Sequence, residues 1–407
     1  MSIIAFCLHK NNKANKHRIG SGVRILLTAL LFFVFFLDKP MSAFASETRP
    51  EDNTPFEKID TFDIDYTDIQ NAINHALSDQ ESFQFESYVK DLVKGEESFS
   101  VQGVIKKVLS LLIEELKANL GSLMRLLAIA VIAAVFTNFS HTFQNSQVAE
   151  TGFYVTYLLM FVILSSTFLS ATSIASQTVS RLLEFMKALV PTYCMTVAFC
   201  TGATTSTLYY EGILVLITVV NVVLMKVVLP LSNIYMMATL ADNITSEDTL
   251  TKLTDLLVTV IKWFLKSLLA VVIGIGTVQS LIAPAIDQVK RSSVMKATDM
   301  IPGIGSILSG VTETVLGAGV LLKNCVGVAG MVVVIVICAI PLIKLVIYVF
   351  IYKLLAAAIQ PISDKRVVNC VSACAQATSL LLQTVFVTAV LFEIVITIVA
   401  VSTMKAL

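Results

Sequence analysis

Six charged or amide side chains stand inside or beside long apolar tracts, where few other residues could carry out chemistry. They are Lys226, Lys323, Asn324, Lys344, Lys353 and Glu393. A charge at the centre of a bilayer costs roughly 2.5–3.5 kcal/mol on insertion scales, so protein or water must compensate each one. Lys344 and Lys353 lie near the ends of short apolar segments and are expected to extend toward the interface. These six residues are the candidate polar or gating elements.

Lys226 and Glu393 lie deeper in their segments than the other charges. Each side chain could face the helix bundle, a subunit contact or a wet cavity, or it could extend toward the interface. A salt bridge between Lys226 and Glu393 is one hypothesis. Lys323 and Asn324 belong to VLLKNCVG, residues 320–327, after a short apolar segment. This pattern favours either a half-hairpin that dips into the membrane, placing both near a protein-lined interior or the interface, or an ordinary short loop.

The sequence holds little that could support catalysis. All four histidines are far in sequence from the CVSAC motif of Cys370 and Cys374, so a metal site is not predicted there. There is no P-loop, dinucleotide-binding glycine fingerprint or Gly-x-Ser-x-Gly elbow. The small-residue runs GIG at 274–276 and GAG at 317–319 instead predict close contacts between helices. We expect no enzymatic activity, no cofactor and no nucleic-acid partner.

The composition indicates an integral membrane protein. Of the 407 residues, 56% are hydrophobic and only 14% are charged, whereas soluble proteins have about 25% charged residues. The predicted fold is all-α, a polytopic membrane bundle of about six to eight spans, with a small acidic extracytoplasmic region at its N-terminus. Eight spans fit best, at 123–139, 153–175, 188–203, 213–235, a segment ending near 283, 326–343, 345–360 and 377–401.

Seven spans, or six with a re-entrant segment, stay open as alternatives. With eight spans, the two basic loops at 284–323 and 364–366 both lie in the cytoplasm, as the positive-inside rule favours, and the C-terminus lies outside. Residues 246–266 have an amphipathic period that predicts an interfacial helix capped by Thr245 or Ser246. Its apolar stripe comprises Leu250, Leu253, Leu256, Leu257, Val260, Ile261 and Phe264, and Trp263 marks the depth at which it enters the membrane.

The N-terminal residues 1–45 have the pattern of a signal peptide. A basic region precedes a 13-residue apolar core at 25–37, and Ala43-Phe44-Ala45 before Ser46 predicts cleavage between Ala45 and Ser46. An uncleaved first anchor is the alternative. Residues 46–100 form the acidic extracytoplasmic region, residues 101–122 an interfacial amphipathic helix and residues 123–407 the transmembrane domain. From 46 to 122 there are sixteen acidic residues against seven basic ones.

An ordered series of motifs in the second half resembles a known family. It comprises Ile301-Pro302 with Gly305, Thr312-Glu313-Thr314, VLLKNCVG with Gly330, Pro341 with Ile343-Lys344, Tyr352-Lys353-Leu354 and Gln360-Pro361. This series closely resembles the stage III sporulation protein AE family of endospore-forming bacteria, over roughly residues 100–407.

The resemblance implies a non-enzymatic membrane subunit of the channel or secretion-like complex that links mother cell and forespore and is required for forespore development. The expected location is the mother-cell-derived membrane around the forespore. The expected partners are membrane lipid, the other stage III A proteins, which include an ATPase and ring components, and, indirectly, stage II sporulation protein Q. A homo-oligomer is compatible with this role. The alternative is a stand-alone transporter or permease for a small solute, which buried Lys226 and Glu393 favour.

Overall fold

The computed structural model describes residues 64–77, 83–94, 146–201, 203–244, 249–298 and 305–402, with single positions between 113 and 135. All of them belong to one compact unit, Met41–Leu407. Every regular element in these ranges is helical, which confirms the all-α prediction. The signal peptide with its cleavage point at Ala45 and Ser46 lies outside the described residues, as do most of the helix expected at 101–122 and the span expected at 123–139.

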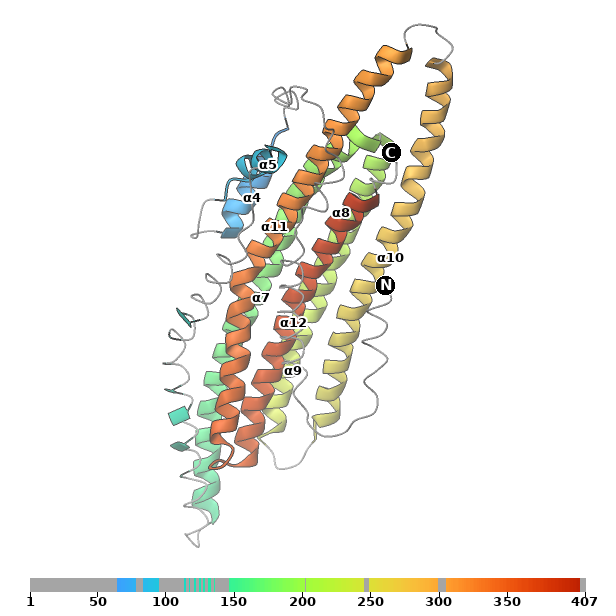
Figure 1. Ribbon diagram of the computed structural model, residues 1–407. Coiled ribbons are helices and arrows are strands. Elements are labelled where there is room, and N and C mark those ends of the chain that lie inside the picture. Colours follow the sequence, from blue (N-terminus) through green and yellow to red (C-terminus); the bar gives the residue numbers. More distant parts are fainter. Residues whose placement is uncertain are drawn as a thin grey trace, which may run out of the picture. The chain divides into compact units, whose positions relative to one another are not determined.

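Within the described ranges 64–77, 83–94 and 146–402 with its gaps, two short helices precede five long helical segments (Figure 1). The short ones are α4 (Thr67–Leu77) and α5 (Phe85–Lys94). The long segments are α7 (Ser146–Thr201), then α8 (Ala203–Val223) continued by the π-helical turn η3 (Leu224–Val228) and α9 (Leu229–Asp242), then α10 (Thr251–Thr298), α11 (Gly305–Ile359) and α12 (Lys365–Ser402).

Each long segment contains a stretch that can cross a membrane. These are Tyr154–Phe199, Thr205–Asp242, Thr251–Gln279, Gly317–Ile359 and Lys365–Val401. At a rise of about 1.5 Å per residue, even the shortest exceeds the roughly 30 Å of the hydrocarbon core. Large apolar side chains are exposed along them, including Val155, Met195 and Val215, each more than 60% exposed. Such surfaces are stable in contact with lipid, so the chain is a membrane protein.

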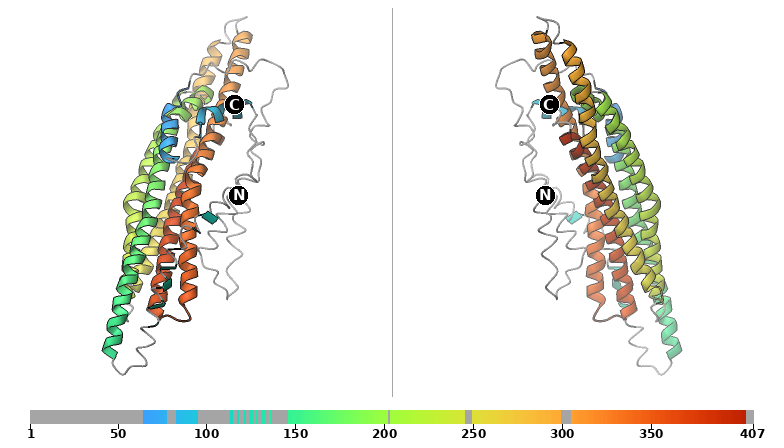
Figure 2. Two further views of the ribbon diagram at one scale, coloured as in Figure 1. Left: turned by 90° about the vertical axis from the view of Figure 1, so that its left-hand side faces the viewer. Right: turned by 90° about the vertical axis from the view of Figure 1, so that its right-hand side faces the viewer.

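Helix α12 lies at the centre of the packing. It contacts α11 most extensively and also α7, α9 and α10, while α8 packs against both α7 and α10. The shared core is apolar and includes fully buried Phe168, Leu182, Val326, Leu381 and Phe392. Figure 2 shows α12 side by side with α11, which continues beyond the end of α12. The core positions the few polar side chains described below.

Two breaks expected between spans are absent. The predicted spans 153–175 and 188–203 are parts of one helix, α7, which continues through Pro191. The predicted spans 326–343 and 345–360 are likewise parts of α11, which continues through Pro341. Proline removes one backbone donor, but helices in a bundle tolerate it because neighbouring groups satisfy the freed carbonyl. A proline or a short polar interval was therefore insufficient to mark a loop.

The continuity of α11 also corrects the topology. The half-hairpin proposed before Lys323 is wrong, because residues 305–359 form one helix. The basic residues at 290–296 and at 364–366 consequently lie at opposite ends of α11, and a single helix cannot place both in the cytoplasm. In addition, α10 extends to Thr298 rather than ending near Ala283.

The amphipathic segment at 246–266 is the start of α10, which begins at Thr251. Its buried stripe consists of Thr254, Val258, Ile261, Leu265 and Leu268. The predicted stripe is wrong in part, because Leu253 and Leu256 are 45% and 58% exposed. Lipid accepts apolar side chains as readily as the core does, so hydrophobicity does not indicate which face of a membrane helix is buried. The cap candidates Thr245 and Ser246 lie outside the described residues.

Candidate functional site

Lys323 is fully buried in the bundle. Its Nζ donates a hydrogen bond to the backbone carbonyl of Ala400, 3.2 Å away. Ala400 lies in the last turn of α12, where the carbonyls have no partner within the helix and carry partial negative charge. The ammonium group therefore stabilises the C-terminal end of α12 from the middle of α11. Lys323 thus faces a protein-lined interior, one of the placements that the sequence left open, but on a continuous helix.

Helices α7 and α11 also approach each other closely near Lys323. A Cβ atom at Gly327 would lie 2.9 Å from Tyr193 Oη, and one at Gly330 would lie 2.8 Å from Leu189 Cδ2. Tyr193 Oη in turn donates to the carbonyl of Ile396 at 3.5 Å, one turn before Ala400. We call Tyr193, Lys323, Gly327, Ile396 and Ala400 the three-helix junction. It joins α7, α11 and α12, and no motif in the sequence predicts that these residues meet.

Helices α4 and α5 pack against the same part of the bundle. α4 contacts α7 and α5 contacts α11, burying Ile69, Ile73 and Phe85 completely. The side chain of Gln70 joins the two helices, because its Nε2 donates to the Phe83 carbonyl at 2.8 Å and its Oε1 accepts from the Phe85 amide at 2.9 Å. We call residues 64–77 and 83–94 the head. These residues pack against the bundle through buried apolar side chains.

A polar contact also joins the head to α7. His75 Nδ1 lies 3.0 Å from Glu184 Oε2 of α7, in an exposed pair. Burial raises the pKa of Tyr66 to about 12. The head therefore packs against α7 and α11, two of the three helices that form the junction. The sequence showed the acidic character of the head but not where it packs.

Glu393 is buried on α12, at 8% exposure. Neither carboxyl oxygen has a hydrogen-bond partner among the described residues. An ionised carboxylate without a partner is strongly unfavourable in an apolar environment. Glu393 therefore needs a proton, a cation or a polar group from outside the described part of the chain. Burial in the bundle is one of the arrangements that the sequence left open for this residue.

Lys226 lies in the π-helical turn η3 and its side chain is exposed. π-Turns occur often at functional sites, because the extra residue displaces side chains from the regular helical face. The hypothesis that Lys226 pairs with Glu393 is wrong, since the Glu393 oxygens have no partner and Lys226 points outward. Lys344, Lys353 and Asn324 are all half-buried. Their roles stay predictions.

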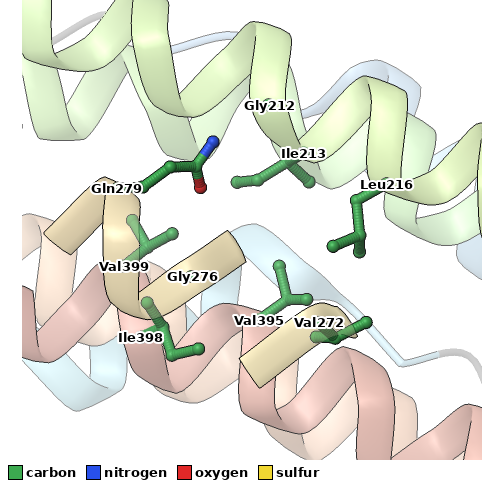
Figure 3. Close-up of a pocket in the computed structure, with 9 residues that line it drawn as sticks. All are labelled: Gly212, Ile213, Leu216, Val272, Gly276, Gln279, Val395, Ile398 and Val399. Carbon is green, nitrogen blue, oxygen red and sulfur yellow. The ribbon is translucent and has the colours of Figure 1, made fainter. Parts of the chain in front are cut away.

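A second close contact joins α8, α10 and α12 (Figure 3). Gln279 of α10 lies directly against Gly212 of α8, and Ile398 of α12 against Gly276 of α10, so neither glycine leaves room for a side chain. Gly276 thus makes the close helix contact predicted for the GIG run, whereas Gly274 has no neighbour within 4 Å. Small residues at helix crossings permit this approach.

Comparison with known proteins now identifies the family. The family model described as stage III sporulation protein AE matches residues 83–403. The chain belongs to the stage III sporulation protein AE family. It is 26% identical over 310 residues to stage III sporulation protein AE of Bacillus subtilis (strain 168), covering 76% of this chain and 78% of that one. No solved structure matches it.

The region matched by the family model covers most of the described structure. A membrane subunit of sporulation fits the five apolar helical segments. The match begins at residue 83 and so includes α5, the three-helix junction and all the candidate polar residues from Lys226 to Glu393. α4 precedes the matched region. The resemblance inferred from the ordered motifs of the second half is confirmed.

Proposed function

We propose that this chain is a non-enzymatic subunit of the channel or secretion-like complex that links mother cell and forespore. Family membership and the name of the Bacillus subtilis relative support a sporulation role. In this proposal the chain lies in the mother-cell-derived membrane around the forespore, with the head on the extracytoplasmic side. Its companions are the ATPase and ring components of the stage III A proteins and, indirectly, stage II sporulation protein Q.

The docked head is the observation that carries the proposal. Its inner face is apolar and buried against α7 and α11, while Asp65, Asp68 and Glu86 are exposed on its outer face. The hydrogen bonds of Gln70 fix the two helices relative to each other. A rigid surface with exposed carboxylates favours binding of a protein partner, because little conformational entropy is lost on association.

Charge reversal on the head tests this function. Asp68→Lys with Glu86→Lys should leave the bundle intact, since both side chains are exposed, and should lower spore formation at least tenfold at an unchanged protein level. Copurification of the other stage III A proteins should fall in parallel. The matched control is Asp255→Lys, an exposed acidic position on α10. Normal sporulation and copurification in the double variant would contradict the proposal.

A stand-alone transporter is the second candidate, and Glu393 is the observation that favours it. A buried carboxyl group without a described partner is a common feature of proton and ion pathways in membranes. Purified protein in lipid vesicles distinguishes the two candidates. Selective solute flux without any companion, abolished by Glu393→Gln, would support the transporter. Flux that requires the companions supports the subunit.

A further inference from the structure

Glu393 lies on the side of α12 that packs against α11. Thr397 and Ala400 follow it by four and seven residues, which places all three on one side of the helix. Thr397 Oγ1 lies 3.7 Å from Met331 Sδ of α11, and the Ala400 carbonyl accepts the hydrogen bond of Lys323. The opposite side of α12 faces α8 and α10 through Val395, Ile398 and Val399 (Figure 3). The buried carboxyl group of Glu393 therefore faces α11.

No hydrogen-bond donor among the described residues holds this carboxyl group. Both of its oxygens are buried without a partner there. The Thr397 hydroxyl donates to the backbone carbonyl of Glu393 at 2.7 Å, not to the side chain. Lys323 Nζ is bonded to Ala400, about 10.5 Å beyond Glu393 along the axis of α12, which is too far for an ion pair. An ionised carboxylate in this position would bear its full desolvation cost.

A proton removes this cost more readily than a metal ion does. Metal ions that bind carboxylates take several further oxygen, nitrogen or sulfur ligands. Among the described residues, no group of three or more His, Cys, Asp or Glu side chains is placed to hold a metal. A proton needs no further ligand, because it converts the carboxylate into a neutral acid. A neutral acid costs far less to bury in an apolar interface.

Lys323 is the buried cation on this interface within the described ranges. Since Thr397 meets Met331 and a short loop joins the two antiparallel helices, Glu393 lies opposite the stretch of α11 between Lys323 and Lys344, in which no residue is charged. No buried side chain described on α10 is ionisable. The buried ionisable groups of α7 and α11 near this contact and of α9 are Tyr193, Cys325, Cys338, Tyr235 and Asp242. Tyrosine and cysteine side chains are neutral at pH 7, and Asp242 is hydrogen-bonded to the start of α10.

We propose that Glu393 is a proton-binding site within the bundle. Its carboxyl group takes up one proton to become neutral and releases that proton to become ionised, and the positive charge of Lys323 favours release. The site belongs to the chain itself, whether the chain acts as a subunit or as a transporter. Its test needs only purified protein, so a negative result leaves the sporulation role untouched.

Infrared spectroscopy of the full chain in detergent at pH 7 detects the bound proton. A neutral carboxyl group has a carbonyl stretching band that an ionised one lacks, and exposed carboxyl groups are ionised at this pH. The difference spectrum between the wild-type protein and Glu393→Gln should contain one such band per chain, shifted in D2O because the proton exchanges. The matched control is Glu211→Gln, at an exposed position on α8, whose difference spectrum should lack the band. Absence of the band with Glu393→Gln, or an equal band with Glu211→Gln, would overturn the proposal.

The pH dependence of the band tests reversible binding and the influence of Lys323. Raising the pH should remove the band from the folded protein, and a return to pH 7 should restore it. Lys323→Met removes the neighbouring positive charge and should increase the affinity for the proton about three- to tenfold, so that the band persists to higher pH. Lys365→Met, at the exposed start of α12, should leave the pH profile unchanged. Circular dichroism at each pH confirms that the helices are intact. A band that no pH removes from the folded protein, or equal pH profiles for the two lysine variants, would overturn the proposal.

Discussion

The ammonium group of Lys323 on α11 donates a hydrogen bond to the carbonyl of Ala400 in the last turn of α12, across 3.2 Å. The lysine is fully buried, and the carbonyl belongs to the helix end that lacks internal partners. Lys323→Met keeps most of the side-chain volume but leaves this carbonyl without its cation. We expect the free energy of unfolding in detergent to fall by about 1.5–3 kcal/mol.

Lys344→Met is the matched control for this change, because Lys344 lies on the same helix and is half-buried rather than buried. Thermal unfolding followed by circular dichroism should show a clearly lower midpoint for Lys323→Met than for the control. Equal midpoints would mean that the contact between α11 and α12 does not depend on the cation.

The glycine contacts between α7 and α11 allow a second prediction. A methyl group at Gly330 would lie 2.8 Å from Leu189 Cδ2, so Gly330→Ala requires the fully buried Leu189 side chain to shift within the packed core. We expect a loss of about 1–3 kcal/mol in the free energy of unfolding. Gly274→Ala is the control, since nothing lies within 4 Å of that position, and alanine there should stabilise the helix by about 0.5–1 kcal/mol.

Opposite signs for these two alanine substitutions are the expected result in thermal unfolding. The double variant Gly330→Ala with Leu189→Val should recover part of the loss, because it shortens the side chain that the new methyl group meets. If Gly330→Ala is as stable as Gly274→Ala, the close packing of α7 on α11 is incorrect.

The sequence was sufficient to predict the class of fold. Composition required a helical membrane protein, since spans must satisfy their own backbone hydrogen bonds. The chemical cost of a buried charge identified Lys323 and Glu393, both of which are buried in the bundle. These conclusions depend only on residue type and on the length of apolar tracts.

The number and ends of the helices were harder to predict. Pro191 and Pro341 each lie inside a continuous helix, where neighbouring helices compensate for the missing donor. Tyr193 and Gly327 are in contact although they are distant in sequence. Gln70 and Phe83 are residue types that give no sign in the sequence that they interact. Such contacts depend on which helix faces meet, and apolar periodicity does not determine this when lipid and core are equally apolar.

The start of α10 provides a third prediction. The carboxylate of Asp242 accepts hydrogen bonds from the Leu250 amide at 2.6 Å and from Thr251 Oγ1 at 2.8 Å, so the end of α9 caps the beginning of α10. Asp242→Ala should lower the free energy of unfolding by about 1–2 kcal/mol through loss of this cap. Asp255→Ala, at an exposed position on α10, is the control and should change it little. Equal effects would exclude a capping role.

Glu393 allows a prediction of the opposite sign. Its carboxyl oxygens are buried and have no hydrogen-bond partner among the described residues. Removing an unsatisfied polar group from an apolar site relieves its desolvation penalty, so Glu393→Leu should raise the free energy of unfolding by about 1–3 kcal/mol. Glu211→Leu, at an exposed position on α8, should leave it nearly unchanged. The measurement is thermal unfolding of the purified protein in detergent. A marked loss of stability in Glu393→Leu would show that the carboxyl group is held by a partner outside the described residues, and would direct the search toward that partner.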